Sequence, residues 1–148
     1  MRIEKDFKEF IELLNKNNVR YLIVGGYAFA FHAEPRFTKD IDFFVEGSEA
    51  NAERLLNALA GFGFKDIGLK KDDFIKPGYI VQLGVPPVRI DLLTSVSGLD
   101  FAAAWENRVT GSYGDIPAFF VSKIDLIRNK MAIGRKQDLS DIEKLQQI

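Results

Sequence analysis

Residues 22–45 read LIVGGYAFAFHAEPRFTKDIDFFV, and this stretch decides the fold. Its apolar beginning, extended back to Val19, predicts a short buried strand that ends at Gly25 and Gly26. Residues 27–33 then predict a helix. Because glycine has no Cβ atom, the backbone at this turn can approach a phosphate closely, and the first N–H groups of the helix would point at it. The turn therefore predicts an anion-binding site.

Two acidic side chains stand on the second strand that this stretch predicts, over residues 40–45. Asp40 and Asp42 project to the same side because side chains alternate along a strand. A third acid, Asp91, lies in a further predicted strand over residues 88–93. If the two strands are neighbours, the three carboxylates converge, and their mutual repulsion is relieved best by a cation. The pattern therefore predicts a site for divalent metal.

The expected metals are two Mg²⁺ or Mn²⁺ ions, because hard cations prefer oxygen ligands. Asp40 and Asp42 could bridge both ions, whereas Asp91 would complete the site of only one. Two ions about 3.5–4 Å apart can clamp the attacking and leaving oxygens of a displacement at phosphorus. An anion seat opposite a metal site is what a nucleoside triphosphate requires.

The rest of the chain alternates helical and strand-like patterns. This order predicts a mixed α/β fold, in which a small mixed sheet of about four to six strands is flanked by helices and the carboxy-terminal part is helical. One domain is expected over residues 1–148, with its core over 19–120 and its carboxy-terminal helices over 121–148. The further expected elements are a helix that stops at Asn17 and Asn18, a helix capped by Ser48, two or three strands within 64–93, a helix over 98–108, a strand over 109–113, and helices over 121–133 and 139–148.

Composition and charge limit the classes of function. The 148 residues carry 20 basic and 21 acidic side chains, so no large net charge draws the chain toward nucleic acid or anionic lipid. There are no cysteines, which excludes disulfides and thiolate metal sites. No apolar run approaches the roughly 20 residues that cross a bilayer, and the charged beginning of the chain is unlike a secretory signal. A cytoplasmic location without a membrane partner is therefore the expectation.

Residues 22–28, 36–42 and 89–91 carry a resemblance to a known group of enzymes. Their glycine pair, acid-x-acid strand and third acid on a separate strand resemble the nucleotidyltransferase superfamily of the polymerase-β type. The arrangement is similar to small prokaryotic stand-alone domains, including the abortive-infection and toxin–antitoxin nucleotidyltransferases. The resemblance implies the nucleotidyltransferase fold and a metal-dependent transfer of a nucleoside monophosphate from a nucleoside triphosphate to an acceptor hydroxyl, with release of pyrophosphate. The acceptor would be an RNA end such as that of tRNA, a protein side chain or a small molecule.

The resemblance also implies a role for each matching residue. Gly25 and Gly26 would hold the triphosphate, and Asp40 and Asp42 would bind both ions. Asp91 would bind the catalytic ion and help to activate the acceptor hydroxyl.

The chain departs from many relatives at the second position of the turn, where Gly26 replaces a serine. The hydroxyl that would contact phosphate is then missing, and Thr38 or a lysine is expected to compensate. Lys123 and Lys130 are the candidates, because they fall within about 20° of each other around a helix. They either reach across to the β- and γ-phosphates or lie on a solvated helix face. They border an expected apolar stripe made of Ile124, Ile127 and Met131.

Four other polar residues have competing interpretations. His32 is expected at a helix end rather than in catalysis. Arg36 either reaches substrate phosphate or forms a salt bridge where the second strand begins. Asp138 is placed to cap the last helix, with Asp141 three residues further in the manner of a capping box. The alternative for these two acids is a position near the site.

Two rival functions remain open. A catalytically silent member would bind nucleotide or a partner protein, for example within a toxin–antitoxin pair. The three retained acids disfavour it, because a silent domain has no need of a repulsive acidic cluster. In a plain interaction domain the acids would merely be solvated. Binding of ATP, CTP, GTP and UTP with and without Mn²⁺ separates these functions.

Overall fold

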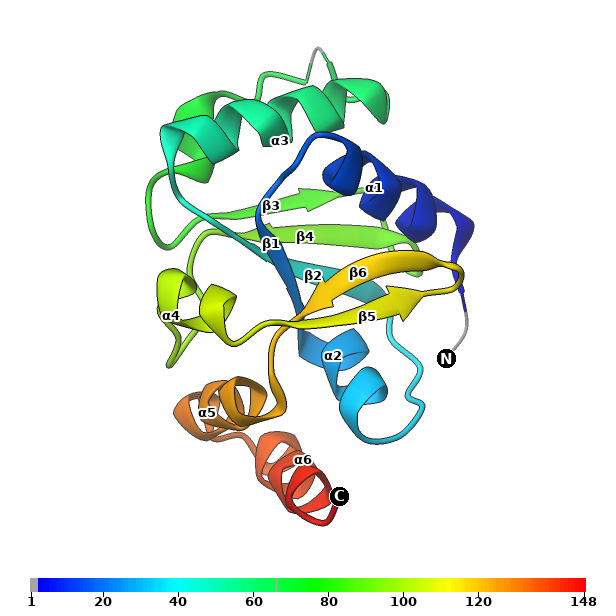
Figure 1. Cartoon of the computed structure of the whole chain (residues 1–148), viewed down its shortest axis with the longest axis vertical. Helices are drawn as coiled ribbons and strands as arrows, with labels where there is room; N and C mark the ends of the chain where they lie inside the picture. Colours follow the sequence, from blue (N-terminus) through cyan, green and yellow to red (C-terminus); the bar gives the residue numbers. More distant parts are fainter. Residues whose placement is uncertain (1–2, 66) are drawn as a thin grey trace.

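Strands from both halves of the chain form one mixed sheet through the middle of the molecule (Figure 1). The computed structural model describes residues 3–65 and 67–148, so Met1, Arg2 and Asp66 of the expected domain lie outside the described residues. The six described strands are β1 (Tyr21–Val24), β2 (Asp40–Val45), β3 (Ile80–Leu83), β4 (Arg89–Leu93), β5 (Val109–Tyr113) and β6 (Ile116–Phe120). Their order across the sheet is β3-β4-β2-β1-β6-β5. The predicted mixed α/β class is confirmed.

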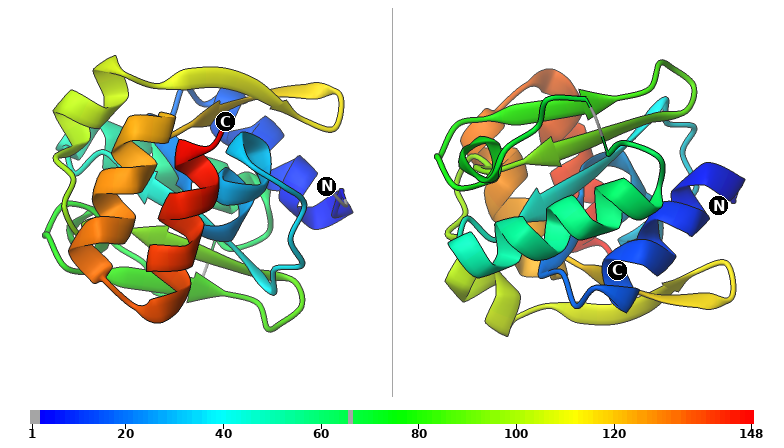
Figure 2. Two further views of the ribbon diagram at one scale, coloured as in Figure 1. Left: turned by 90° about the horizontal axis from the view of Figure 1, so that it is seen from below. Right: turned by 90° about the horizontal axis from the view of Figure 1, so that it is seen from above.

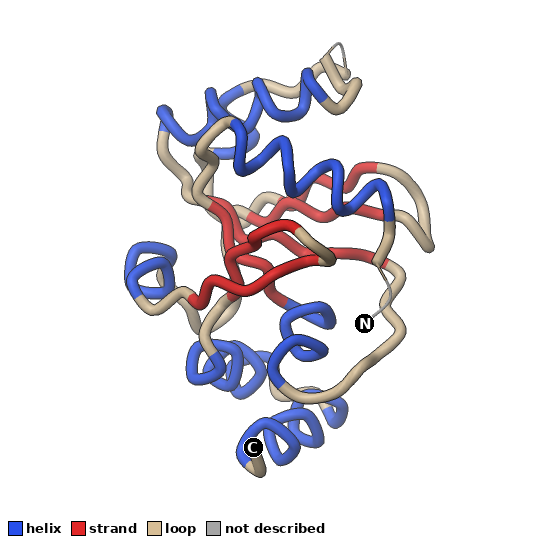
Figure 3. Tube along the Cα trace, turned by 45° about the vertical axis from the view of Figure 1, so that its right-hand side comes forward, coloured by secondary structure: helices blue, strands red, loops and turns tan. Residues whose placement is uncertain are grey.

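The helices lie in two layers, one on each face of the sheet (Figure 3). Those described are α1 (Lys5–Lys16), α2 (Gly25–His32), α3 (Glu49–Gly61), α4 (Phe101–Glu106), α5 (Lys123–Ile133) and α6 (Lys136–Gln146), with a short 3₁₀ helix at Lys71–Phe74. Helices α1 and α3 cover one face, and α2, α4, α5 and α6 lie on the other (Figure 2). Within residues 3–65 and 67–148, no helix combines the length and the apolar character needed to cross a bilayer.

Alternation along β2 distributes its side chains between the two layers. Phe43 packs in the cluster that contains Phe10 of α1, whereas Phe44 packs in the opposite cluster with Leu126 of α5. Asp42 shares the parity of Phe44, so it faces the layer that contains α2, α5 and α6. The fold therefore directs the acids toward the carboxy-terminal helices.

The register of β2 brings the expected site residues together. This strand pairs antiparallel with β1 on one side and parallel with β4 on the other. Asp42 stands opposite Asp91 of β4 and opposite Val24 of β1. Because Gly25 directly follows Val24, the glycine turn and the acids meet at one end of the central strands.

The strand β6 was not expected from the sequence. It pairs antiparallel with β5 and parallel with β1, which lies about a hundred residues earlier in the chain. Pro117 weakens the sequence pattern, because proline cannot donate to a strand ladder. Pairing with distant residues, rather than a local pattern, places β6 in the sheet.

The two last helices differ from expectation at their beginnings. Helix α5 begins at Lys123 because the side chain of Ser122 caps it. Helix α6 begins at Lys136 with Arg135 as its N-cap residue, so Asp138 lies in the first turn. The expectation that Asp138 precedes the helix as its cap is therefore wrong. Its carboxylate instead reaches back and accepts a hydrogen bond from the backbone N–H of Arg135, at 3.2 Å.

Candidate active site

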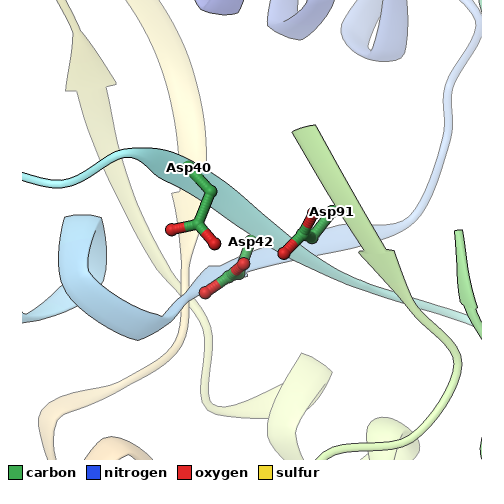
Figure 4. A group of neighbouring side chains, drawn as sticks. All are labelled: Asp40, Asp42 and Asp91. Atoms are coloured by element: carbon green, nitrogen blue, oxygen red, sulfur yellow. The ribbon is translucent and has the colours of Figure 1, made fainter. Parts of the chain in front are cut away.

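The carboxylates of Asp40, Asp42 and Asp91 point toward one another from two neighbouring strands (Figure 4). One oxygen of each lies within 4.8 Å of the other two. Asp40 and Asp42 come from β2, and Asp91 comes from β4 beside it. The structure thus brings together the three acids that the sequence singled out.

Burial and mutual repulsion disfavour full ionisation of this cluster. Burial raises the pKa of Asp42 to about 8, and the charges of Asp40 and Asp91 add to the effect. Burial and the neighbouring Asp91 also raise the pKa of Asp40, although Arg89 opposes this. Three partly buried carboxylates that repel one another can be stabilised by a divalent cation, and their oxygens are the ligands that a hard cation prefers.

Arg89 contacts two of the three acids, and this contact was not predicted from the sequence. Its Nε donates to Asp91 Oδ1 at 2.9 Å, and its Nη2 donates to Asp40 Oδ2 at 2.7 Å and to Asp91 Oδ2 at 3.1 Å. The signal was present in the sequence, because Arg89 and Asp91 are two residues apart on one strand and share a face. The guanidinium offsets part of the charge of two of the three acids.

The glycine turn packs directly against the acid-bearing strand. Gly25 has a φ of +67°, and a Cβ atom there would collide with the carboxylate of Asp42. A Cβ atom on Gly26 would lie 2.6 Å from Cγ2 of Thr38. Both positions therefore require glycine in this packing, one of them also for its backbone conformation. Helix α2 begins at this turn and has no side-chain cap at its N-terminus, so its first N–H groups are available to an anion.

A cleft of about 360 Å³ joins the turn and the acids to the carboxy-terminal helices. The glycine turn and Asp42 line it together with residues of α5 and α6. The residues that line it are Val24, Gly25, Gly26, Arg36, Asp42, Ile80, Leu93, Ser95, Val96, Ser97, Asn129, Lys130, Ile133, Arg135, Gln137, Asp138 and Asp141. A larger, more open groove runs along α1 and Pro117 and is lined by none of the three acids.

Asp141 anchors the cationic side of this cleft. Its fully buried carboxylate accepts hydrogen bonds from both terminal nitrogens of Arg36, at 2.9 and 2.5 Å, from Lys130 at 2.8 Å and from Gln137 at 2.9 Å. Burial alone would raise the pKa of Asp141, but the bonds from Arg36, Lys130 and Gln137 hold it well below its usual value. The capping interpretation of Asp141 is wrong, and Arg36 forms an ion pair with a helix 105 residues away.

The inward face of α5 is more polar than the predicted stripe, because Asp125, Asn129 and Lys130 are buried there beside Leu126. Ile124 and Met131 are 65% and 64% exposed, whereas Asn129 and Lys130 are buried. Lys130 pairs with Asp141 at 2.8 Å and with Asp138 at 3.5 Å. These partners compensate the desolvation of the ammonium group, and helical periodicity gives no sign of them.

The two candidate lysines lie in different places. Lys130 lines the cleft, whereas the ammonium group of Lys123 donates to the backbone carbonyl of Ile148 at 2.7 Å. Thr38 packs its methyl group beneath Gly26, and its hydroxyl donates to the backbone carbonyl of Asp40 at 3.0 Å. The structure thus groups Lys130 with the glycine turn and leaves Lys123 at the end of the chain.

His32 links α2 to the end of β6. Its Nε2 donates to the backbone carbonyl of Val121 at 2.7 Å, and burial lowers its pKa. This position at a helix end agrees with the structural interpretation of the residue.

The amino-acid sequence matches a known protein family. A family model described as a nucleotidyltransferase of unknown function (DUF6036) matches residues 2–148. No curated protein matches the chain.

Proposed function

The chain belongs to the nucleotidyltransferase family DUF6036, and we propose that it transfers a nucleoside monophosphate from a nucleoside triphosphate to an acceptor hydroxyl. The acceptor oxygen forms a bond to the α-phosphorus while the bond from that phosphorus to the β-phosphate breaks, so pyrophosphate leaves. The acceptor is an RNA end such as that of tRNA, a protein side chain or a small molecule.

One observation carries this proposal: Asp42 stands beside Asp91 on one side and beside the glycine turn on the other. A ligand that bridges cation and turn must present anionic oxygens to both. A triphosphate does so, because its phosphates can bind metal on one side and backbone N–H groups on the other.

Two Mg²⁺ or Mn²⁺ ions would be held by the three acids, with Asp40 and Asp42 as ligands of both and Asp91 as a ligand of one. Bound there, the ions would supply charge neutralisation for the phosphoryl oxygens in the displacement. The protein positions the acids for this task by strand register, which is rigid, rather than by a loop.

The protein's own cations hold the other end of the triphosphate. Lys130 and Arg36 line the same cleft as Asp42, and both are fixed by Asp141. Charge-assisted bonds from such preorganised donors to phosphate are strong. Asp91 orients the acceptor hydroxyl and receives its proton as the new bond forms.

A silent, nucleotide-binding or partner-binding member is the second candidate, and one observation favours it. Arg89 already offsets the charge of Asp40 and Asp91, so the acidic cluster persists without metal. In that case the chain would bind its ligand, or a partner such as the other member of a toxin–antitoxin pair, without chemistry.

Calorimetry with ATP, CTP, GTP and UTP, with and without Mn²⁺, tests the proposal together with an assay of pyrophosphate release. We expect binding that depends on Mn²⁺ and release that depends on an acceptor. Acceptors to be screened are tRNA, total protein and small hydroxyl compounds. Metal-dependent binding without release across these acceptors supports the silent nucleotide-binding candidate. Absence of nucleotide binding contradicts the transfer reaction and leaves only a partner-binding role.

A further inference from the structure

Apolar side chains line part of the cleft, among them Ile80, Val96 and Ile133. Ile80 is 61% exposed although it belongs to a strand beside the site. An apolar surface next to a phosphate seat suits the sugar and base of a nucleotide, since pockets for small ligands combine apolar walls with few polar groups.

Asn129 is a buried residue among those that line the cleft. It is 7% exposed, and its Nδ2 donates to the backbone carbonyl of Ser97 at 2.9 Å. Because a carbonyl only accepts hydrogen bonds, this contact fixes which end of the amide points at Ser97. The oxygen, Oδ1, therefore points the other way.

The Oδ1 atom of Asn129 has a free hydrogen-bonding capacity. No donor to it is found within residues 3–65 and 67–148, and it is not among the polar atoms sealed from solvent. Because Oδ1 has no protein donor among these residues and remains accessible to solvent, it can accept a hydrogen bond from a ligand in the cleft.

We propose that Asn129 is a specificity residue, whose Oδ1 accepts a hydrogen bond from the nucleoside part of the substrate. This inference rests on the proposed function, because it takes the ligand to be a nucleoside triphosphate. The donor is a ribose hydroxyl or an N–H group of the base. Asn129 directly precedes Lys130, so α5 presents a phosphate contact and a nucleoside contact side by side.

The chemistry of the amide defines the selectivity. Because Nδ2 donates one of its hydrogens to Ser97 and so orients the amide, Asn129 offers the ligand Oδ1 as an acceptor. A site built to bind one hydrogen-bonding group rejects analogues that lack it, because the buried partner is then left unpaired. Substrates without the matching donor are therefore discriminated against.

The test compares analogues in the wild-type protein and in Asn129→Ala, by calorimetry with Mn²⁺ and no acceptor. The parent probe is the one of the four common nucleoside triphosphates that binds most tightly. Its counterparts are analogues that each lack one hydrogen-bond donor: the 2′-hydroxyl, the 3′-hydroxyl or a donor of the base. We expect the wild type to bind one counterpart about five- to tenfold more weakly than the parent. In Asn129→Ala the affinity for the parent triphosphate should fall to that for this counterpart. The affinity for the counterpart itself should be the same as in the wild type.

Asn57→Ala provides the matched control, because Asn57 is an exposed helical asparagine of α3. It should leave the whole series unchanged. The identity of the discriminated counterpart tells a ribose contact from a base contact.

Two results overturn the inference while leaving the proposed function intact. One is equal affinity of the wild-type protein for the parent triphosphate and all its counterparts. This result rules out the proposed contact even if Asn129→Ala does not fold. The other is an Asn129→Ala protein that binds all of them more weakly by one common factor, as a packing role would produce. Failure of the wild type to bind any triphosphate with Mn²⁺ overturns the proposed function as well.

Discussion

Arg89 and Asp91 form a two-pronged ion pair within one strand. Nε of the arginine lies 2.9 Å from Oδ1 of the aspartate, and Nη2 lies 3.1 Å from Oδ2. The same Nη2 reaches Asp40 on the neighbouring strand, at 2.7 Å. The guanidinium therefore holds two acids of the cluster and competes for the oxygens that a metal ion would use.

Replacing Arg89 with methionine is expected to change metal affinity and stability in opposite directions. Without the competing cation, Mn²⁺ should bind about tenfold more tightly, because the carboxylate oxygens that Arg89 engages become free for the ion. The metal-free protein should melt at a lower temperature, because three acids then repel one another. Calorimetry and thermal melting at pH 8 measure both effects.

The control for this change is Arg54→Met, at an exposed position of α3. It should alter neither quantity. Weaker Mn²⁺ binding by Arg89→Met would show instead that the arginine orients the acids for the ion.

Enlarging Gly26 is expected to weaken triphosphate binding through contact with Thr38. In Gly26→Ala the new Cβ would stand 2.6 Å from Thr38 Cγ2, so the turn must shift away from its anion-binding conformation. The double variant Gly26→Ala with Thr38→Ser removes that methyl group and should restore much of the affinity. Calorimetry with a triphosphate and Mn²⁺ reports it. Lack of rescue would mean that the added methyl group blocks the phosphate itself.

The two lysines of α5 form a matched pair for testing the phosphate contact. Lys130→Met removes a cation that lines the cleft, and triphosphate affinity should fall about tenfold or more, as for loss of a charge-assisted bond. Lys123→Met removes a cation that binds the carbonyl of Ile148 and should leave affinity within about twofold. Similar losses in the two variants would argue against a specific contact by Lys130.

The convergence of the acids could be predicted from the sequence because a strand has a period of two. That period fixes the common direction of Asp40 and Asp42, whatever the rest of the fold. The sequence alone did not show that the strand of Asp91 lies beside that of Asp42. The parallel pairing of β2 and β4 places the two residues next to each other. The mixed α/β class followed in the same way from local patterns along the chain.

The ion-pair network on the cationic side of the cleft could not be predicted, because it depends on contacts between distant residues. Helical spacing favours burial of Ile124 and Met131, yet α5 turns Lys130 inward. This orientation is stable because Asp141 and Arg36, which is 105 residues from that acid, complete an ion-pair network. A buried charge is tolerated only with its partners in place, and a pattern along one helix cannot show them.

Asp91→Asn should separate binding from catalysis. Asp91 is the acid farthest along the sheet from the glycine turn, since β2 lies between β4 and β1. Its loss should therefore leave triphosphate binding within about threefold. Transfer should fall by a factor of about a thousand or more, as for removal of a group that acts on the transition state. Pyrophosphate release and calorimetry measure the two quantities, and normal turnover would show that Asp91 has no catalytic role.

Asp141→Asn should destabilise the protein in a way that depends on pH. The ion pairs hold the pKa of Asp141 below its ordinary value of 3.8, so the folded state binds the proton less tightly than the unfolded state. The stabilisation is therefore complete well above pH 4 and is lost as pH falls through the lowered pKa. At pH 7 the variant should lose about 3 kcal/mol of unfolding free energy, typical of breaking a buried ion pair. The difference from wild type should shrink as pH is lowered below about 4.

The matched control is Glu34→Gln, which breaks the exposed pair between Glu34 and Lys144 at 2.7 Å. Solvent screens such a pair, so its loss should cost less than about 1 kcal/mol. Urea unfolding at pH 7 and at pH 3 measures both variants against the wild type. A Glu34→Gln protein as unstable as Asp141→Asn, or a constant Asp141→Asn deficit at both pH values, would contradict the assignment of Asp141 as the ionised centre of the network. Because Arg36 and Lys130 depend on that charge for their positions, the same variant should also bind triphosphate more weakly at pH 7.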